Sequence, residues 1–190
     1  VIMKKIIILI SLIGFTSSCV VQGWTNDYER LSESQKAKII EIETFQDIHK
    51  GFIYKINGQQ LREELRNHSK SIVYIFSNGC SSDLCKPISV YEDYASRNGY
   101  NLFLVMNGFA NLDETLKQTF SNVLFAMDNY YYNENHCYKY SRYFENELTN
   151  KPLNEKNKIF LGNLYFFHGD TLIQILKELP NEETPAGNKG

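Results

Sequence analysis

The chain has 190 residues, a formal net charge of −2, and a composition that is 43% hydrophobic and 14% aromatic. The aromatic content excludes a disordered chain, and the near-neutral charge excludes the broad basic surface that nucleic-acid binding requires. After the N-terminal segment, no stretch is long and apolar enough to cross a bilayer. The sequence therefore predicts one globular domain with no nucleic-acid partner.

The N-terminal segment has the pattern of a bacterial export signal. Two lysines precede an apolar run over residues 6–13, and small residues then lead to Cys19. The run is shorter than the ~20 residues of a permanent transmembrane helix. The segment resembles a bacterial lipobox, which implies that residues 1–18 are a signal peptide and that Cys19 carries lipid. The protein would then be anchored in the cell envelope, facing the periplasm. The alternative is an ordinary signal peptide beside an incidental Cys19.

Beyond a polar, aperiodic stretch at 19–34, which we predict to be a tether, strand and helix patterns alternate. Apolar, β-branched and aromatic runs predict strands at 52–56, 71–76, 101–106 and 123–127. Between them, apolar spacing predicts helices at 59–67, 88–98 and 112–120.

The C-terminal third interrupts this alternation. An Asn- and Tyr-rich stretch at about 128–158 predicts an insertion with one helix, at about 137–148. Strands at 159–167 and 171–175 predict a closing β-hairpin, and a disordered tail follows at 180–190. The order predicts an α/β domain with a mixed central sheet, flanking helices and a C-terminal β-hairpin.

Two of the three cysteines beyond Cys19 lie together, because Cys80 and Cys85 both follow the strand predicted at 71–76. An exported chain meets an oxidising compartment, so one internal disulfide can form and one thiol stays free. A cysteine just before a helix has a lowered pKa, because the helix N-terminus stabilises the thiolate. Residues five apart in a continuous helix are ~7.5 Å apart along its axis. Since a disulfide needs Cα atoms within ~7 Å, pairing requires Cys80 to lie in a turn or the first helical turn to unwind.

This order of strand, turn, cysteine and helix resembles the thioredoxin-like superfamily, especially its membrane-tethered members. Residues 74–76 match the buried strand, Cys80 the nucleophile, Pro87 a frequent helix proline, and residues 166–170 the closing hairpin. The resemblance implies a thioredoxin-like domain over 35–179. It implies a thiol–disulfide oxidoreductase without a cofactor, in which Cys80 attacks another protein's disulfide and Cys85 resolves the intermediate.

Departures from the family pattern leave alternatives open. The usual motif has two residues between its cysteines and this one has four, and Leu161 stands near the position of the family's cis-proline. The wider spacing also resembles one branch of the peroxiredoxins, with Ser77 three residues before Cys80 and Arg142 as a candidate arginine. In a third interpretation, the pair is structural or vestigial, on a non-catalytic domain that binds a protein partner.

His136 and Cys137 are the remaining candidates for chemistry. With Cys80 and Cys85 they could form a copper or zinc site. We instead expect a packed histidine, a buried free cysteine and no metal, because adjacent side chains point in different directions. The many tyrosines between 130 and 143 could line a partner surface, but we expect them to pack the insertion against the sheet.

Overall fold

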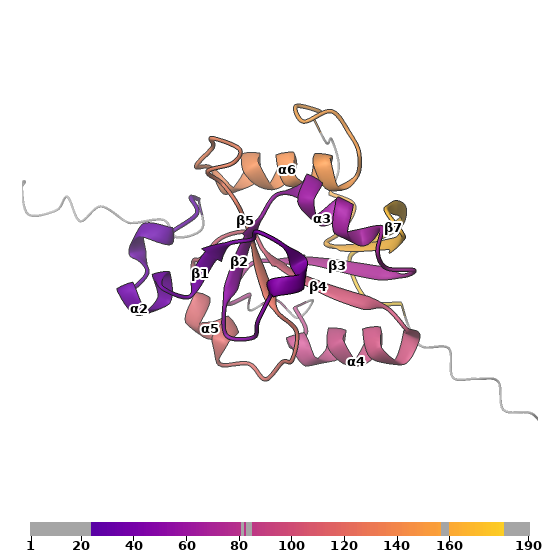
Figure 1. Ribbon diagram of the computed structural model, residues 1–190, viewed down its shortest axis with the longest axis horizontal. Helices are drawn as coiled ribbons and strands as arrows, with labels where there is room; N and C mark the ends of the chain where they lie inside the picture. The colour runs from indigo at the N-terminus through magenta and orange to yellow at the C-terminus, as the bar shows by residue number, and fades with distance from the viewer. Residues whose placement is uncertain (1–23, 81, 83–84, 157–159, 181–190) are drawn as a thin grey trace, which may run out of the picture.

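Seven strands form one mixed sheet in the computed structural model of the chain, which describes residues 24–80, 82, 85–156 and 160–180 (Figure 1). Their order across the sheet is β1-β2-β5-β4-β3-β6-β7. The strands are β1 (Ile39–Glu41), β2 (Ile53–Ile56), β3 (Ser71–Phe76), β4 (Asn101–Met106), β5 (Leu124–Met127), β6 (Leu164–His168) and β7 (Thr171–Leu176).

The direction of the strands changes next to β3. The first five strands in this order, β1, β2, β5, β4 and β3, are mutually parallel. In contrast, β6 pairs antiparallel with β3, and β7 pairs antiparallel with β6. Parallel neighbours need crossover connections, and helices provide them for the chain from β2 to β5. The β6–β7 hairpin therefore closes the sheet beside β3.

Helices cover both faces of the sheet, as Figure 1 shows. One face carries α3 (Gly58–Leu65) and α6 (Cys137–Leu148), and the other carries α4 (Ile88–Asn98) and α5 (Leu112–Leu116). Short helical segments, η1 (Tyr28–Arg30), α2 (Glu33–Lys36) and η2 (Phe45–Asp47), flank β1.

Strand β3 supplies side chains to both halves of the core. Val73 and Ile75 belong to the cluster under α3 and α6, while Ile72, Tyr74 and Phe76 belong to the cluster over α4 and α5. This split follows from the alternation of side chains along a strand. Because both faces are covered, β3 is buried over its full length, which explains its continuous apolar sequence.

Helix α6 is an integral part of this core. Its residues Tyr140, Phe144 and Leu148 are fully buried, and they follow the four-residue spacing of one helix face. Gly58, the first residue of α3, lies so close to α6 that a Cβ atom there would overlap the carbonyl oxygen of Phe144. A glycine at the start of α3 thus allows the two helices to pack side by side.

The described part of the N-terminal segment packs on the domain. Thr25 pairs with His136 in an isolated antiparallel bridge, and the backbone N–H of Phe109 donates to the carbonyl oxygen of Asn26 at 2.9 Å. Residues 25 and 26, within the tether predicted at 19–34, thus contact the domain. No helix in the described ranges is long and apolar enough to cross a membrane.

Most of the predicted elements are confirmed. The bounds of β3, α4, β4 and α6 agree with those predicted, and the mixed sheet with its closing hairpin is present. Helix α5 is shorter than predicted, ending at Leu116, and β6 starts only at Leu164. The predicted signal peptide, Cys19 and the predicted tail from 181 onward lie outside the described residues.

Candidate functional site

The loop that follows β3 carries a disulfide bond between Cys80 and Cys85, whose Cα atoms are 6.0 Å apart. Cys80 is exposed and Cys85 is partly buried. The loop turns tightly, because the backbone N–H of Cys85 donates to the carbonyl oxygen of Ser82 at 2.8 Å. A disulfide is possible at this spacing because neither cysteine lies in the helix that follows, which begins at Ile88.

Residues just before Cys80 fix where the loop begins. Asn78 is buried; its amide nitrogen donates to the carbonyl oxygen of Gly108 at 2.8 Å, and its amide oxygen accepts from Thr115 at 2.7 Å. Gly79 has a φ of 66°, in the left-handed region that glycine adopts without a steric penalty. The pair Asn78–Gly79 therefore anchors the turn against the loop after β4 and directs Cys80 to the surface.

The spacing between the cysteines and the next helix is the one that the sequence predicted. Helix α4 begins at Ile88, three residues after Cys85 and eight after Cys80, with Pro87 as its N-cap. The N–H of Ile88 donates to the side-chain oxygen of Gln118 at 2.9 Å. Neither cysteine therefore belongs to the first turn of α4.

A cavity of about 250 Å³ lies beside the disulfide. The disulfide and the end of β3 form one side, and α6 contributes Ser141 and Glu145. The segment before β6 contributes Phe160, Gly162 and Asn163, and β6 itself contributes Tyr165. The full lining is Tyr74, Ile75, Phe76, Ser77, Cys80, Cys85, Asn107, Ser141, Glu145, Phe160, Gly162, Asn163 and Tyr165.

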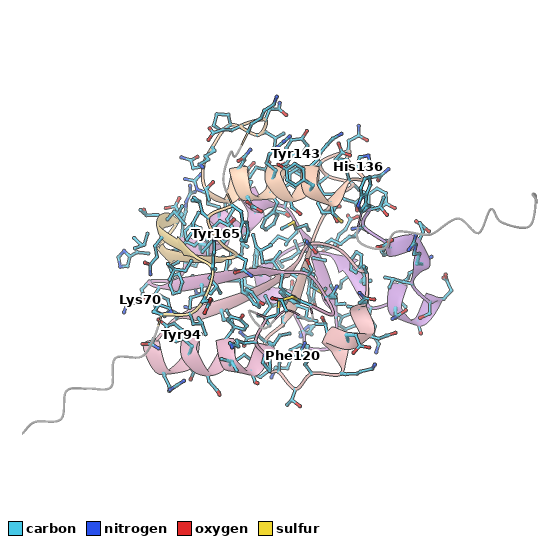
Figure 2. All side chains as sticks on the ribbon, turned by 180° about the vertical axis from the view of Figure 1, so that it is seen from behind. Lys70, Tyr94, Phe120, His136, Tyr143 and Tyr165 are labelled. Carbon is cyan, nitrogen blue, oxygen red and sulfur yellow. A yellow bond between two sulfur atoms is a disulfide. The ribbon has the colours of Figure 1, made fainter. Side chains whose placement is uncertain are left out.

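Glu145 gives this cavity an acid–base group. Burial raises the pKa of the Glu145 carboxyl, and its hydrogen bond with Tyr165 and the charge of Lys151 only partly oppose that increase. Burial and the nearby carboxylate in turn raise the pKa of Tyr165. Figure 2 shows Tyr165 on the side of the sheet that α6 covers. A carboxyl with a raised pKa is a candidate for acid–base catalysis.

The segment before β6 faces the disulfide without a proline. Leu161, the residue near the family's cis-proline position, is exposed and does not line the cavity, whereas its neighbours Phe160 and Gly162 do. No cis peptide bond occurs in the described ranges. The backbone N–H of Ile75 donates to the carbonyl oxygen of Asn163 at 2.9 Å, which holds this segment against the end of β3.

Cys137, the free cysteine among the described residues, has a different environment on the first turn of α6. Its Sγ lies 3.0 Å from the carbonyl oxygen of Thr25, 3.6 Å from that of Asn107 and 2.8 Å from the hydroxyl of Tyr140. Burial, together with the charge of Asp27, raises the pKa of the Cys137 thiol. Carbonyl oxygens accept a proton from S–H and have none to donate to a thiolate, so the site favours the protonated thiol.

Cys137 lines a second cavity of about 170 Å³. Ser77 and Asn107 line both this cavity and the one beside the disulfide. The amide nitrogen of Asn107 donates to the hydroxyl oxygen of Ser77 at 3.0 Å. The two cavities are therefore adjacent, since they share one hydrogen-bonded pair of residues.

The remaining predicted site residues do not gather around the disulfide. Arg142 stacks on the ring of Tyr143, 5.2 Å from its centroid, and does not line the cavity. His136 is the N-cap of α6 and lies at the beginning of that helix in Figure 2. Within the described part of the chain, no group of three His, Cys, Asp or Glu residues is arranged to hold a metal ion, so the copper or zinc interpretation of His136–Cys137 gains no support.

Sequence reasoning missed Glu145, Ser141 and Tyr165 as site residues. One signal was available, since Ser141 and Glu145 are four residues apart and so share a helix face. Nothing in the sequence indicated that this face of α6 would lie opposite Cys80, more than sixty residues earlier. The tyrosines between 130 and 143 differ in exposure. Tyr132 and Tyr140 are buried, as expected, whereas Tyr130, Tyr131 and Tyr138 are exposed.

Comparison of the chain with protein-family models, with curated proteins and with solved structures finds no match. The fold and the site define an α/β protein with an exposed disulfide at the end of a central strand.

Proposed function

We propose that this chain is a lipid-anchored thiol–disulfide oxidoreductase of the cell envelope, of thioredoxin-like type, with Cys80 and Cys85 as its redox pair. The observation that carries the proposal is the combination of an exposed sulfur, Cys80, with a cavity that contains a carboxyl of raised pKa, Glu145. A disulfide that served only to stabilise the fold would need neither the cavity nor the carboxyl.

The proposed reaction starts from the reduced pair. The Cys80 thiol loses its proton and its sulfur attacks one sulfur of a partner's disulfide, which breaks that bond and releases a thiolate that takes up a proton. The Cys85 thiol, after losing its proton, attacks the Cys80 sulfur of the mixed disulfide and releases the partner's second thiol. The partner gains two electrons and two protons, and the protein is left with the Cys80–Cys85 disulfide. A dithiol of the envelope then reduces that disulfide by the reverse exchange.

The exposures of the two sulfurs support these roles. Exposed Cys80 is accessible to a partner's disulfide, whereas Cys85 is partly buried and attacks only inside the protein. Glu145, across the cavity, accepts the thiol proton and delivers it to the leaving thiolate. The α/β fold, with its antiparallel hairpin beside the cysteine-bearing strand, supports the thioredoxin-like assignment at the level of architecture.

Trapping of the intermediate tests the proposal. The Cys85→Ser variant, mixed with a peptide disulfide, should accumulate a mixed disulfide at Cys80 that mass spectrometry identifies, while the reduced wild type turns over without accumulation. Cys80→Ser should form no adduct through residue 85. A wild-type disulfide that resists a cellular dithiol, with no adduct in Cys85→Ser, would instead establish a non-catalytic binding domain. Faster oxidation of Cys80 by hydrogen peroxide than by peptide disulfides would establish the peroxidase.

The lipid anchor at Cys19 is tested separately. The full-length gene should yield a membrane-bound protein whose N-terminal peptide begins at Cys19 and carries acyl chains. A mature N-terminus at another residue, without acyl chains, would contradict this part of the proposal and leave the redox part intact.

A further inference from the structure

Exposed aromatic side chains gather where the described chain begins. Trp24 is 69% exposed and Tyr138 is 73% exposed. Their segments are joined, because the N–H of Cys137 donates to the carbonyl oxygen of Trp24 at 3.0 Å and Thr25 pairs with His136.

Two further exposed tyrosines, Tyr130 and Tyr131, lie on the loop that leads from β5 to His136. Figure 1 shows this loop and the indigo start of the chain at the same end of the molecule. We call Trp24, Tyr130, Tyr131 and Tyr138 the aromatic end.

We propose that the aromatic end lies in the headgroup region of the membrane and holds the Cys80–Cys85 cavity close to the bilayer. The inference rests on the lipid anchor at Cys19 that forms part of the proposed function. Tryptophan and tyrosine suit this location, because their apolar rings and polar N–H or O–H groups match the boundary between lipid and water.

The length of chain between Cys19 and Trp24 argues for a membrane rather than a protein partner. Five residues, even fully extended, span at most about 18 Å. If the acyl chains on Cys19 are in the bilayer, Trp24 cannot lie farther than that from the boundary of the hydrocarbon layer. An anchor this short places the side of the domain that carries Trp24 against the membrane.

Two lysines near the aromatic end are paired with carboxylates. Lys139 lies 3.1 Å from a carboxylate oxygen of Glu134. Lys55, whose ammonium group lies 5.3 Å from the centre of the Tyr130 ring, is 3.0 Å from a carboxylate oxygen of Glu41. The carboxylates of Glu134 and Glu41 thus offset the charges of these two lysines, and we expect binding to depend mainly on the aromatic rings and little on salt.

This placement has a consequence for the substrate. Thr25 and Cys137, which lie beside the aromatic end, line the smaller cavity, and Ser77 and Asn107 line both that cavity and the one at the disulfide. The Cys80–Cys85 pair is thus near the membrane-facing end of the domain. Its partners would be disulfides held close to the bilayer surface, as in membrane proteins or other anchored proteins.

Trp24 provides the test, because it is the chain's single tryptophan. The full-length protein, purified from membranes, is reconstituted into phosphatidylcholine vesicles with and without lipids brominated near the headgroup. We expect the brominated lipids to quench Trp24 emission at least about twofold, in low and high salt alike. Tyr138→Ser should reduce that quenching, whereas Ile173→Ser, which changes an exposed apolar residue on β7, should not.

The acylation state of Cys19, measured on the same sample, separates the two possible failures. Acylated protein with unquenched, water-exposed Trp24 overturns the inference and leaves the anchor intact. Protein without acyl chains overturns the proposed anchor. Quenching of Trp24 upon addition of vesicles would then still support a membrane-binding surface at the aromatic end. No quenching would overturn the membrane-binding surface as well. Equal quenching in wild type and Tyr138→Ser also counts against the aromatic end.

Discussion

Two sulfur environments border cavities that share Ser77 and Asn107, and they differ in almost every physical respect. Cys80 and Cys85 are on an irregular loop, with one sulfur exposed and a protonatable carboxyl across the cavity. Cys137 is on the first turn of a core helix, and backbone carbonyl oxygens surround its sulfur.

From this difference we expect the cysteines to differ in reactivity. At Cys137, burial and acceptor oxygens favour the protonated, unreactive thiol. Cys80 is exposed, so in the proposed function its sulfur would be accessible to a partner.

Replacement of Cys80 and of Cys137 by serine, one at a time, should show the largest difference between the two sites. Cys80→Ser should lower the rate of peptide-disulfide reduction on the order of 1,000-fold or more, because it removes the attacking sulfur. Cys137→Ser should leave that rate within about twofold of the wild type, because a serine hydroxyl can donate to the same carbonyl oxygens. A stopped-flow assay on the reduced proteins measures both, and a large loss in Cys137→Ser would contradict the contrast.

Alkylation of the reduced protein should reveal the same contrast in the wild type. At neutral pH, Cys80 should react with iodoacetamide about 100-fold faster than Cys137, since the Cys137 pKa is raised and its sulfur is partly buried. The Cys137 rate should continue to increase at pH values above the usual range of a thiol. Peptide mapping after timed quenching gives both rates, and the difference should vanish in urea.

The Glu145 carboxyl should control how the exchange rate depends on pH. Glu145→Gln should slow the attack of Cys80 about tenfold or more, and it should remove a rise in rate that the wild type shows as pH increases through the raised carboxyl pKa. Glu147→Gln, on the same helix but hydrogen-bonded to Tyr132 outside the cavity, is the matched control and should retain the wild-type profile.

Ionisation of Glu145 should also affect stability. A carboxyl whose pKa is raised by burial is penalised in its charged form, so the free energy of unfolding should fall as pH rises from the ordinary carboxyl range through the raised pKa. Glu145→Gln should not show that fall. Urea unfolding at several pH values measures it, and parallel curves for the two proteins would rule out a buried, titrating carboxyl.

Reduction of the disulfide should have the smallest effect. Because Cys80 and Cys85 are only five residues apart, opening the bond should lower the free energy of unfolding by about 2 kcal/mol, less than the loss for a long loop. Urea unfolding with and without reductant measures the change in the Cys137→Ser background. A much larger loss would identify the bond as a structural one.

The strands and helices were predictable because each one is indicated by the residues of its own segment. The continuous apolar run of β3 and the four-residue spacing in α6 each indicate one element without reference to the rest of the chain. The order of the strands across the sheet was harder to predict from the sequence. For example, β5 lies between β2 and β4, and its place depends on where each crossover helix returns the chain to the sheet.

The candidate site was predictable only in part, for a similar reason. The cysteine pair is a local signal, and its position after a buried strand marked it. Glu145 and Tyr165 come from elements that approach the disulfide only through tertiary packing. The docking of Trp24 and Asn26 was missed because a polar, aperiodic sequence does not show which backbone groups will find partners elsewhere.

The position of β3 has a further consequence, for the motions that accompany the redox cycle. Its amide groups are hydrogen-bonded to β4 on one side and to β6 on the other, and all six residues are buried. Their protons should exchange with solvent only when the whole domain opens. In the proposed redox reaction, β3 would therefore be a fixed support for the Cys80–Cys85 pair.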